Sequence, residues 1–202
     1  MPNLISSHSV PATLAASVIL VALAGAVIAG PFEDASAAYN SQDYATAYRL
    51  FRTLADSGNV YAQGAIGVMY AKGQGVPRND AEAVKWYRLA ADGGNAESQL
   101  ALARMYETGR GVSQSDVEAA TWYRRAADQG ESWAQTNLGV KYARGQGVPQ
   151  DYVAAYMWFD LSAAQGDQVA VSNRDAAARR MTAAQIAEAQ KLAHEWKPKP
   201  ER

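Results

Sequence analysis

The sequence has no cysteine and only two histidines, His8 and His194, which lie near opposite ends of its 202 residues. The lack of cysteine excludes disulfide bonds, a thiolate nucleophile and a zinc site built on cysteine. Two distant histidines are also a small supply of the side chains that transfer protons near neutral pH. We therefore predict no metal site, no cofactor and no catalytic residue.

The sequence also has no surplus of charge of either sign. Its 19 Lys and Arg residues and 20 Asp and Glu residues give a formal net charge of −1. Nucleic-acid-binding domains usually carry a basic surplus or a basic stripe, because their ligand is a chain of phosphates. We therefore expect no nucleic acid among the partners of this protein.

No charged side chain precedes Glu33, and residues 12–30 form a continuous run of apolar and small residues. This run resembles a secretory signal peptide (1–29) that is cleaved after Ala29. The usual basic start is missing, and about 20 apolar residues can span a bilayer. The alternatives are an uncleaved inner-membrane anchor facing the periplasm and, third, a buried helix. The first interpretation predicts a periplasmic or secreted bacterial protein.

The most informative feature of the sequence is a repeat of 36 residues. "YAKGQGVPRNDAEAVKWYRLAADGGN" at residues 70–95 returns, with substitutions, at 106 and again at 142. Recurrence at such a period indicates a solenoid of stacked supersecondary units. The positions that return three times are Tyr70/Tyr106/Tyr142, Gly73/Gly109/Gly145, Gly75/Gly111/Gly147, Ala83/Ala119/Ala155, Trp86/Trp122/Trp158 and Gly94/Gly130/Gly166.

Each copy of the repeat predicts two helices. Gly73 and its equivalents end the first helix, because glycine adopts the left-handed C-cap without a steric cost. The second helix begins at an N-cap residue such as Asn79 or Ser115. Glu82 and Glu118 follow three residues later, which predicts capping boxes. The Trp-Tyr pairs return once per repeat, so we expect them to pack the units together rather than to bind a ligand.

The pattern Ala-Gln, Leu-Gly, Gly-x-Gly-Val-Pro and Trp-Phe in "AQTNLGVKYARGQGVPQDYVAAYMWF" (134–159) resembles the Sel-one-like repeat family, a relative of the tetratricopeptide repeats. The resemblance implies an all-α fold, a right-handed α/α superhelical solenoid of about four helix-turn-helix repeats with a C-terminal capping helix. The predicted segments are a degenerate tetratricopeptide-like first repeat (33–58), three repeats (59–94, 95–130 and 131–166), a divergent C-terminal cap (167–197) and a tail (198–202).

The C-terminal cap departs from the repeat in two segments. In Gln168–Arg180, Arg174 replaces the apolar residue of the earlier copies, which predicts a weaker or reoriented first helix. Thr182 then predicts a helix start, and Ile186, Ala189 and Leu192 share one face of that helix, which Trp196 extends.

The resemblance also implies that the first helix of each pair lines a concave binding surface. With Ile66, Leu102 and Leu138 as the buried reference positions, the resemblance selects the residues five and two before each of them and two, five and six after. These offsets form a helical stripe. The candidate partner-binding residues are Tyr61, Lys72, Glu97, Arg104, Glu107, Trp133, Thr136 and Arg144. The remaining positions of the same stripe are Gly64, Val68, Ala71, Leu100, Thr108, Val140 and Ala143.

Trp133 is the most specific candidate of this set. Its equivalents in the other units are Tyr61, Glu97 and Val169, so packing between repeats does not require an aromatic residue there. Trp, Tyr and Arg are also the side chains that most often dominate binding energy at interfaces. The alternative is that Trp133 packs against a neighbouring helix.

These observations predict an exported, non-enzymatic scaffold that binds a protein or peptide partner in bacterial envelope assembly or signalling, and that is a monomer. The first alternative is a hydrolase acting on cell-wall material or an enzyme that interacts with β-lactams. The sequence offers no Ser/His/Asp set for such chemistry. A second alternative is a structural oligomer whose end units stack on one another.

Overall fold

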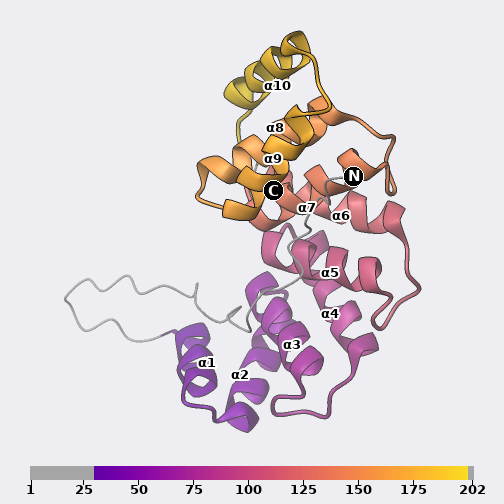
Figure 1. Cartoon of the computed structure of the whole chain (residues 1–202). Coiled ribbons are helices and arrows are strands. Elements are labelled where there is room, and N and C mark those ends of the chain that lie inside the picture. Colours follow the sequence, from indigo (N-terminus) through magenta and orange to yellow (C-terminus); the bar gives the residue numbers. More distant parts are fainter. Residues whose placement is uncertain (1–29, 200–202) are drawn as a thin grey trace, which may run out of the picture.

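The structure is a computed structural model, and it describes residues 30–199. Within this range the chain forms ten helices and no strand (Figure 1). In chain order they are α1 (Pro31–Asn40), α2 (Tyr44–Asp56), α3 (Val60–Lys72), α4 (Asp80–Asp92), α5 (Ala96–Thr108), α6 (Asp116–Asp128), α7 (Ser132–Arg144), α8 (Tyr152–Ala164), α9 (Gln168–Ala178) and α10 (Ala183–Glu195).

The helices pair and stack along the chain. α3 packs against α4, α5 against α6 and α7 against α8, and the second helix of each pair then contacts the first helix of the next. Figure 1 shows these pairs as one continuous stack. We call α3, α5, α7 and α9 the A helices and α4, α6 and α8 the B helices. The all-α solenoid predicted from the repeat is confirmed.

The two glycines of each loop have different structural roles. The first is the left-handed C-cap of its A helix, as Gly109 is for α5. The second touches the start of the preceding B helix. A Cβ atom on Gly111, whose φ is +69°, would lie 2.3 Å from the carbonyl oxygen of Asp80. Each such loop is therefore fastened to the unit before it, and glycine is required there for both its φ and its small size.

The B helices begin at their predicted N-caps, but the predicted capping boxes are wrong. The side chain of Asn79 accepts hydrogen bonds at the start of α4. Its own N–H donates to the carbonyl of Tyr70 at 2.9 Å, so this amide does not need the Glu82 carboxylate. In the next repeat the N–H of Ser115 is used in the same way, and no box with Glu118 forms. Closure of the loop thus supplies the acceptor that the local sequence motif would otherwise provide.

The aromatic pairs of the repeat pack the units together, as predicted. Tyr123 and Phe159 are fully buried, and Trp122 and Trp158 are nearly so. The B-helix ring lies directly on the A helix, because a Cβ atom on Gly139 would lie 2.6 Å from the ring of Phe159. Glycine at this position therefore allows the close approach of α7 and α8.

A column of arginines joins α2 to α4 and then each B helix to the next. In each step the guanidinium of one helix lies over the repeated tryptophan of the next, at a distance at which a cation and an aromatic ring attract each other. The pairs, with the distance from the guanidinium carbon to the ring centroid, are Arg52–Trp86 at 4.9 Å, Arg88–Trp122 at 5.8 Å and Arg124–Trp158 at 5.7 Å.

The last unit deviates from the repeat, as expected for Gln168–Arg180. α9 is an 11-residue helix, two residues shorter than α7. Met181 stands where Gly145 closes α7, so α9 ends without a left-handed cap. Asp175 stands where Gly139 admits a ring, and α10 packs against α8 instead of pairing with α9 (Figure 1).

The predicted apolar face of α10 is partly wrong. Ala189 is fully buried as expected, and Trp196 meets Trp158 edge to face with ring centroids 6.2 Å apart. Leu192, however, is 37% exposed, and Ala193 takes its place in the contact. The main packing partner of the helix is α8. After it, the N–H of Lys199 donates to the carbonyl of Asp128 at 2.7 Å.

The predicted signal peptide (1–29) lies outside the described residues. Among the helices of residues 30–199, none combines the length and the apolar character that crossing a bilayer requires.

Candidate partner-binding surface

The A helices present a common surface on the side that the B helices do not cover. Helical residues at equivalent positions of successive repeats lie side by side on such a surface. We name the exposed and half-exposed candidates on α3, α5 and α7 the A-helix face. Its members are Tyr61, Lys72, Glu97, Arg104, Trp133 and Arg144.

The two aromatic members of the A-helix face lie at the same position of α3 and α7. Tyr61 is 65% exposed and Trp133 is 37% exposed. Tyr61 meets the ring of Phe32 on α1 edge to face, with centroids 6.4 Å apart. Large side chains that stay this accessible supply apolar area to a partner at little conformational cost.

The structure removes Thr136 from the predicted binding surface. This side chain is 0% exposed. Its hydroxyl donates to the Asp167 carboxylate at 2.7 Å and lies 2.8 Å from the hydroxyl of Ser162. Thr136 therefore links α7 to the residues on either side of the α8–α9 turn. Three further residues of the predicted stripe are also buried: Leu100, Val140 and Ala143.

Glu107 is half-buried, and its carboxylate is already bound within the protein. One oxygen lies 2.8 Å from the ammonium of Lys141, and the other accepts a 2.8 Å hydrogen bond from the hydroxyl of Tyr123. Lys141 is itself buried and makes a second ion pair, at 2.7 Å, with Asp116. Burial, reinforced by the charge of Glu107, raises the pKa of Tyr123 well above its ordinary value. This network joins α5, α6 and α7 and leaves little of Glu107 for a partner.

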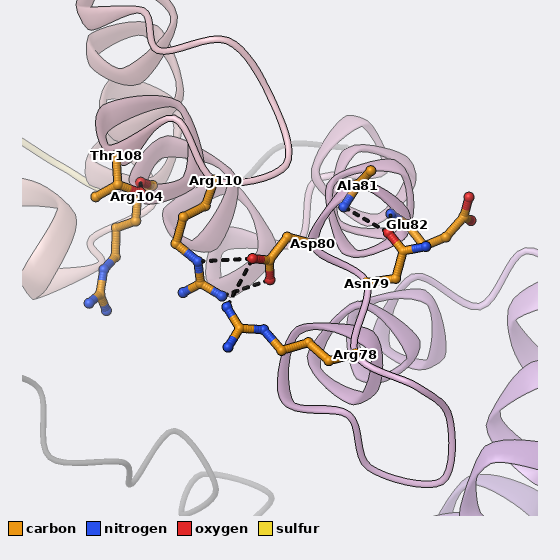
Figure 2. Close-up of polar contacts among 8 residues, drawn as sticks. All are labelled: Arg78, Asn79, Asp80, Ala81, Glu82, Arg104, Thr108 and Arg110. Atoms are coloured by element: carbon orange, nitrogen blue, oxygen red, sulfur yellow. Dashed lines mark hydrogen bonds and ion pairs between the residues drawn. The ribbon is translucent and has the colours of Figure 1, made fainter.

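Arg104 lies beside a second ionic cluster, which Figure 2 shows. The carboxylate of Asp80 accepts from Arg110 at 2.7 Å and from Arg78 at 3.0 Å. These two arginines lower the pKa of Asp80 to about 2. Figure 2 draws no ion pair from Arg104 to Asp80, and the guanidinium of Arg104 lies to one side of the cluster. Two arginines thus bind one carboxylate, and Arg104 lies outside this pairing.

The N-terminal ends of α5 and α7 carry the opposite charge. Burial raises the pKa of the Glu131 carboxyl, and the nearby charges of Glu97 and Asp167 raise it further. The side chain of Glu131 accepts a hydrogen bond from the N–H of Ala134 as the N-cap of α7. Glu97 is exposed. The end of the A-helix face that holds Trp133 is therefore acidic.

Polar groups in the described part of the chain do not form a catalytic constellation. The hydroxyls of Ser132, Ser162 and Thr136 gather near Asp167, but no histidine joins them. His194 is exposed on α10. Over residues 30–199 no group of His, Asp or Glu side chains could hold a metal ion.

Sequence reasoning did not find the Lys141 network. Met69 and Met105 occupy the equivalent positions of α3 and α5, so a lysine in a methionine position was the available indication. It would have pointed to a buried carboxylate close by, because lysine is almost never fully buried unless it is paired.

Comparisons with known proteins identify the repeat. The family model of the Sel1 repeat matches residues 41–59, 60–95, 96–131 and 134–167. A comparison with curated proteins found no match. Repeats of this kind are typically protein-interaction scaffolds.

Two solved structures are similar to this chain. The crystal structure of a Sel1 repeat protein from Oxalobacter formigenes is 34% identical, with a TM-score of 0.68, over 71% of this chain and 59% of that protein. A protective antigen present in uropathogenic Escherichia coli strains, which displays an SLR fold, is 26% identical, with a TM-score of 0.58, over 83% of this chain and 45% of that protein. The chain therefore spans about half the length of these two proteins.

Proposed function

Since the chain belongs to the Sel1 repeat family, we propose that it is a non-enzymatic adaptor that holds a protein partner on the A-helix face. The observation that carries the proposal is the exposure of Tyr61 and Trp133 at a position where the repeat itself does not require an aromatic residue. Arg104 adds a charged side chain of the kind that is enriched at interface hot spots.

We further propose that the adaptor works outside the cytoplasm, in bacterial envelope assembly or signalling. The support is the apolar run of residues 12–30, which precedes every Asp, Glu, Lys and Arg of the chain. Fractionation of cells that express the full chain with a C-terminal tag tests this. Recovery in the periplasm with a start at Gly30 supports cleavage after Ala29. Recovery of the intact chain with the inner membrane supports the anchor, and recovery in the cytoplasm contradicts both.

The binding proposal is tested by photo-crosslinking in cells. A photoreactive amino acid replaces Trp133 on the A-helix face, and a matched probe replaces Val117, which is 61% exposed on α6. We expect one dominant captured protein from position 133 and none from position 117. A third probe replaces Arg104, also on the A-helix face. Equal capture at positions 133 and 117, or no capture at either position 133 or position 104, would contradict the assignment of this face.

Substitutions then test whether the captured protein recognises the proposed residues. Trp133→Ala and Arg104→Glu should each weaken a pull-down of that protein about tenfold or more. Far-UV circular dichroism should show unchanged helix content, because both side chains are at least partly exposed. Wild-type binding by both variants would exclude this face as the site.

A further inference from the structure

The A-helix face is electrically polar along the direction of its helices. On α5, Glu97 lies in the first turn and Arg104 lies seven residues later, which places them about 10 Å apart along the helix axis. Neither side chain has an ion-pair partner among the residues that the structure describes. The two charges are therefore available to groups outside the protein.

Neighbouring units extend the acidic end of this face. Glu131 is the N-cap of α7 and Asp167 is the N-cap of α9. The charges of Glu97 and Asp167 add to the effect of burial in raising the pKa of the Glu131 carboxyl, so the three carboxyl groups lie close enough to interact. Trp133 follows Glu131 by two residues and remains 37% exposed. The face of an exposed indole attracts a cationic side chain, and the acidic residues at this end of the helices favour the same charge.

The opposite end of the face is basic. Lys72 closes α3 and is exposed, and Arg144 is exposed at the equivalent position of α7. Arg78 and Arg110 share the carboxylate of Asp80, and Glu107 and Asp116 share the ammonium of Lys141. These two clusters balance, so the positive charge of this end comes from Lys72, Arg104 and Arg144. The C-terminal ends of the A helices therefore attract carboxylates.

We propose that the A-helix face binds a partner segment of opposite polarity, with its acidic residues over Arg104 and Lys72 and its basic residues beside Glu97 and Trp133. This inference rests on the proposed adaptor function and adds the chemistry and the orientation of the bound segment. Turning the segment end for end would bring like charges together, so the charges select one orientation.

A charge exchange on α5 tests the proposal. Peptides of about 12 residues are selected by phage display on the wild-type chain and on the variant Glu97→Lys with Arg104→Glu, which keeps the net charge. We expect the wild type to enrich peptides whose acidic and basic residues are segregated at opposite ends. The exchanged variant should bind such a peptide turned end for end, so a photoreactive group at the acidic end of the peptide should crosslink the half of α5 that holds residue 104 in the wild type and the half that holds residue 97 in the variant.

Synthetic peptides make the same comparison quantitative. One enriched peptide and a twin of the same composition, in which acidic and basic residues alternate, differ only in the segregation of their charges. By fluorescence anisotropy at low salt, the wild type should bind the enriched peptide about tenfold more tightly than the twin, and the variant Glu97→Gln with Arg104→Gln, which keeps the net charge, should lose this preference. The difference should shrink as salt is added, because exposed charges are screened.

A matched exchange on α10, Glu188→Lys with Lys191→Glu, is the control, because both residues are exposed and the net charge is again unchanged. It should enrich the same peptides as the wild type. Enriched peptides without segregated charges, or an acidic end that crosslinks the same half of α5 in the wild type and in the exchanged variant, would overturn the inference while the adaptor function stands. Enrichment of no peptide on the wild type would overturn both.

Discussion

The guanidinium of Arg174 on α9 donates a hydrogen bond of 2.9 Å to the carboxylate of Asp160 on α8. Both residues are exceptions to the repeat. Arg174 lies 36 residues after Leu138, which is fully buried, and Asp160 lies 36 residues after Arg124 of the arginine column. Each substitution would place a charge in an unsuitable site if it occurred alone. Together they form a pair that ends the solenoid without another apolar contact layer.

We expect Arg174→Met to lower the free energy of unfolding by about 1 kcal/mol. The variant leaves the carboxylate of Asp160 without this donor, and pairs of this accessibility contribute about that much. Urea denaturation of Arg174→Met, Asp160→Asn and the double variant measures the coupling energy of the pair. A coupling energy of zero would mean that the two substitutions are independent.

The two kinds of glycine in the structure predict different costs for the same substitution. Gly111→Ala forces a left-handed φ of +69° and places a Cβ atom 2.3 Å from the carbonyl oxygen of Asp80. Gly166→Ala forces a φ of +96° with nothing within 4 Å of the Cβ atom. Backbone strain alone costs about 1–2 kcal/mol, so we expect this loss for Gly166→Ala and a distinctly larger one for Gly111→Ala. Thermal unfolding of both variants checks this, and equal losses would show that the close contact has no energetic effect.

Much of the fold could be predicted from the sequence because its causes are local and recur. Gly145 ends α7 and Trp158 is buried, and both follow from residue type and period. The failure at Glu82 has a tertiary cause. In a capping box the Glu82 carboxylate would accept a hydrogen bond from the backbone N–H of the N-cap Asn79. That N–H donates instead to the carbonyl of Tyr70, nine residues earlier in the chain. Motif rules that consider only neighbouring residues do not include such a contact.

The candidate site could be predicted less completely. Helical spacing placed Thr136 and Trp133 on one stripe, but only Trp133 is exposed. The difference arises because Asp167, at the start of the next A helix, bonds to the hydroxyl of Thr136. Spacing within one helix does not determine how closely the next helix approaches. Helical spacing also placed Glu107 on the surface. It is half-buried because its partner Lys141 comes from the next repeat, which spacing within one helix does not include.

The Asp80 cluster predicts a loss of stability in acid. The pKa of Asp80 is about 2 in the folded protein, below its ordinary value of 3.8. Because the folded-state pKa is lowered, the stabilisation is complete above about pH 4 and is lost as the pH falls toward 2. Thermal unfolding between pH 2 and 6 should therefore show a smaller decline for Asp80→Asn than for the wild type. Arg110→Gln should reduce the decline in part, because Arg78 still donates to the carboxylate. Parallel pH profiles for all three proteins would contradict the assignment.

The buried network around Lys141 allows two changes to be compared: the loss of the lysine charge alone, and the replacement of Lys141, Glu107 and Tyr123 together. Lys141→Met leaves Glu107 partly buried without its cation, and we expect it to lower the free energy of unfolding by about 1–3 kcal/mol. This is below the usual cost of breaking a buried pair, because the other partner, Asp116, is 42% exposed and can be solvated.

Adding Glu107→Ala and Tyr123→Phe to Lys141→Met should recover most of that stability. Each of the three new residues already occurs at the equivalent position of another repeat, as Met105, Ala143 and Phe159. Apolar groups of similar shape often replace a buried ionic group at little cost. Urea denaturation of the single and triple variants decides the matter. If the triple variant is less stable than Lys141→Met, the ionic network contributes to the stability of the α5–α7 contact in a way that apolar packing cannot replace.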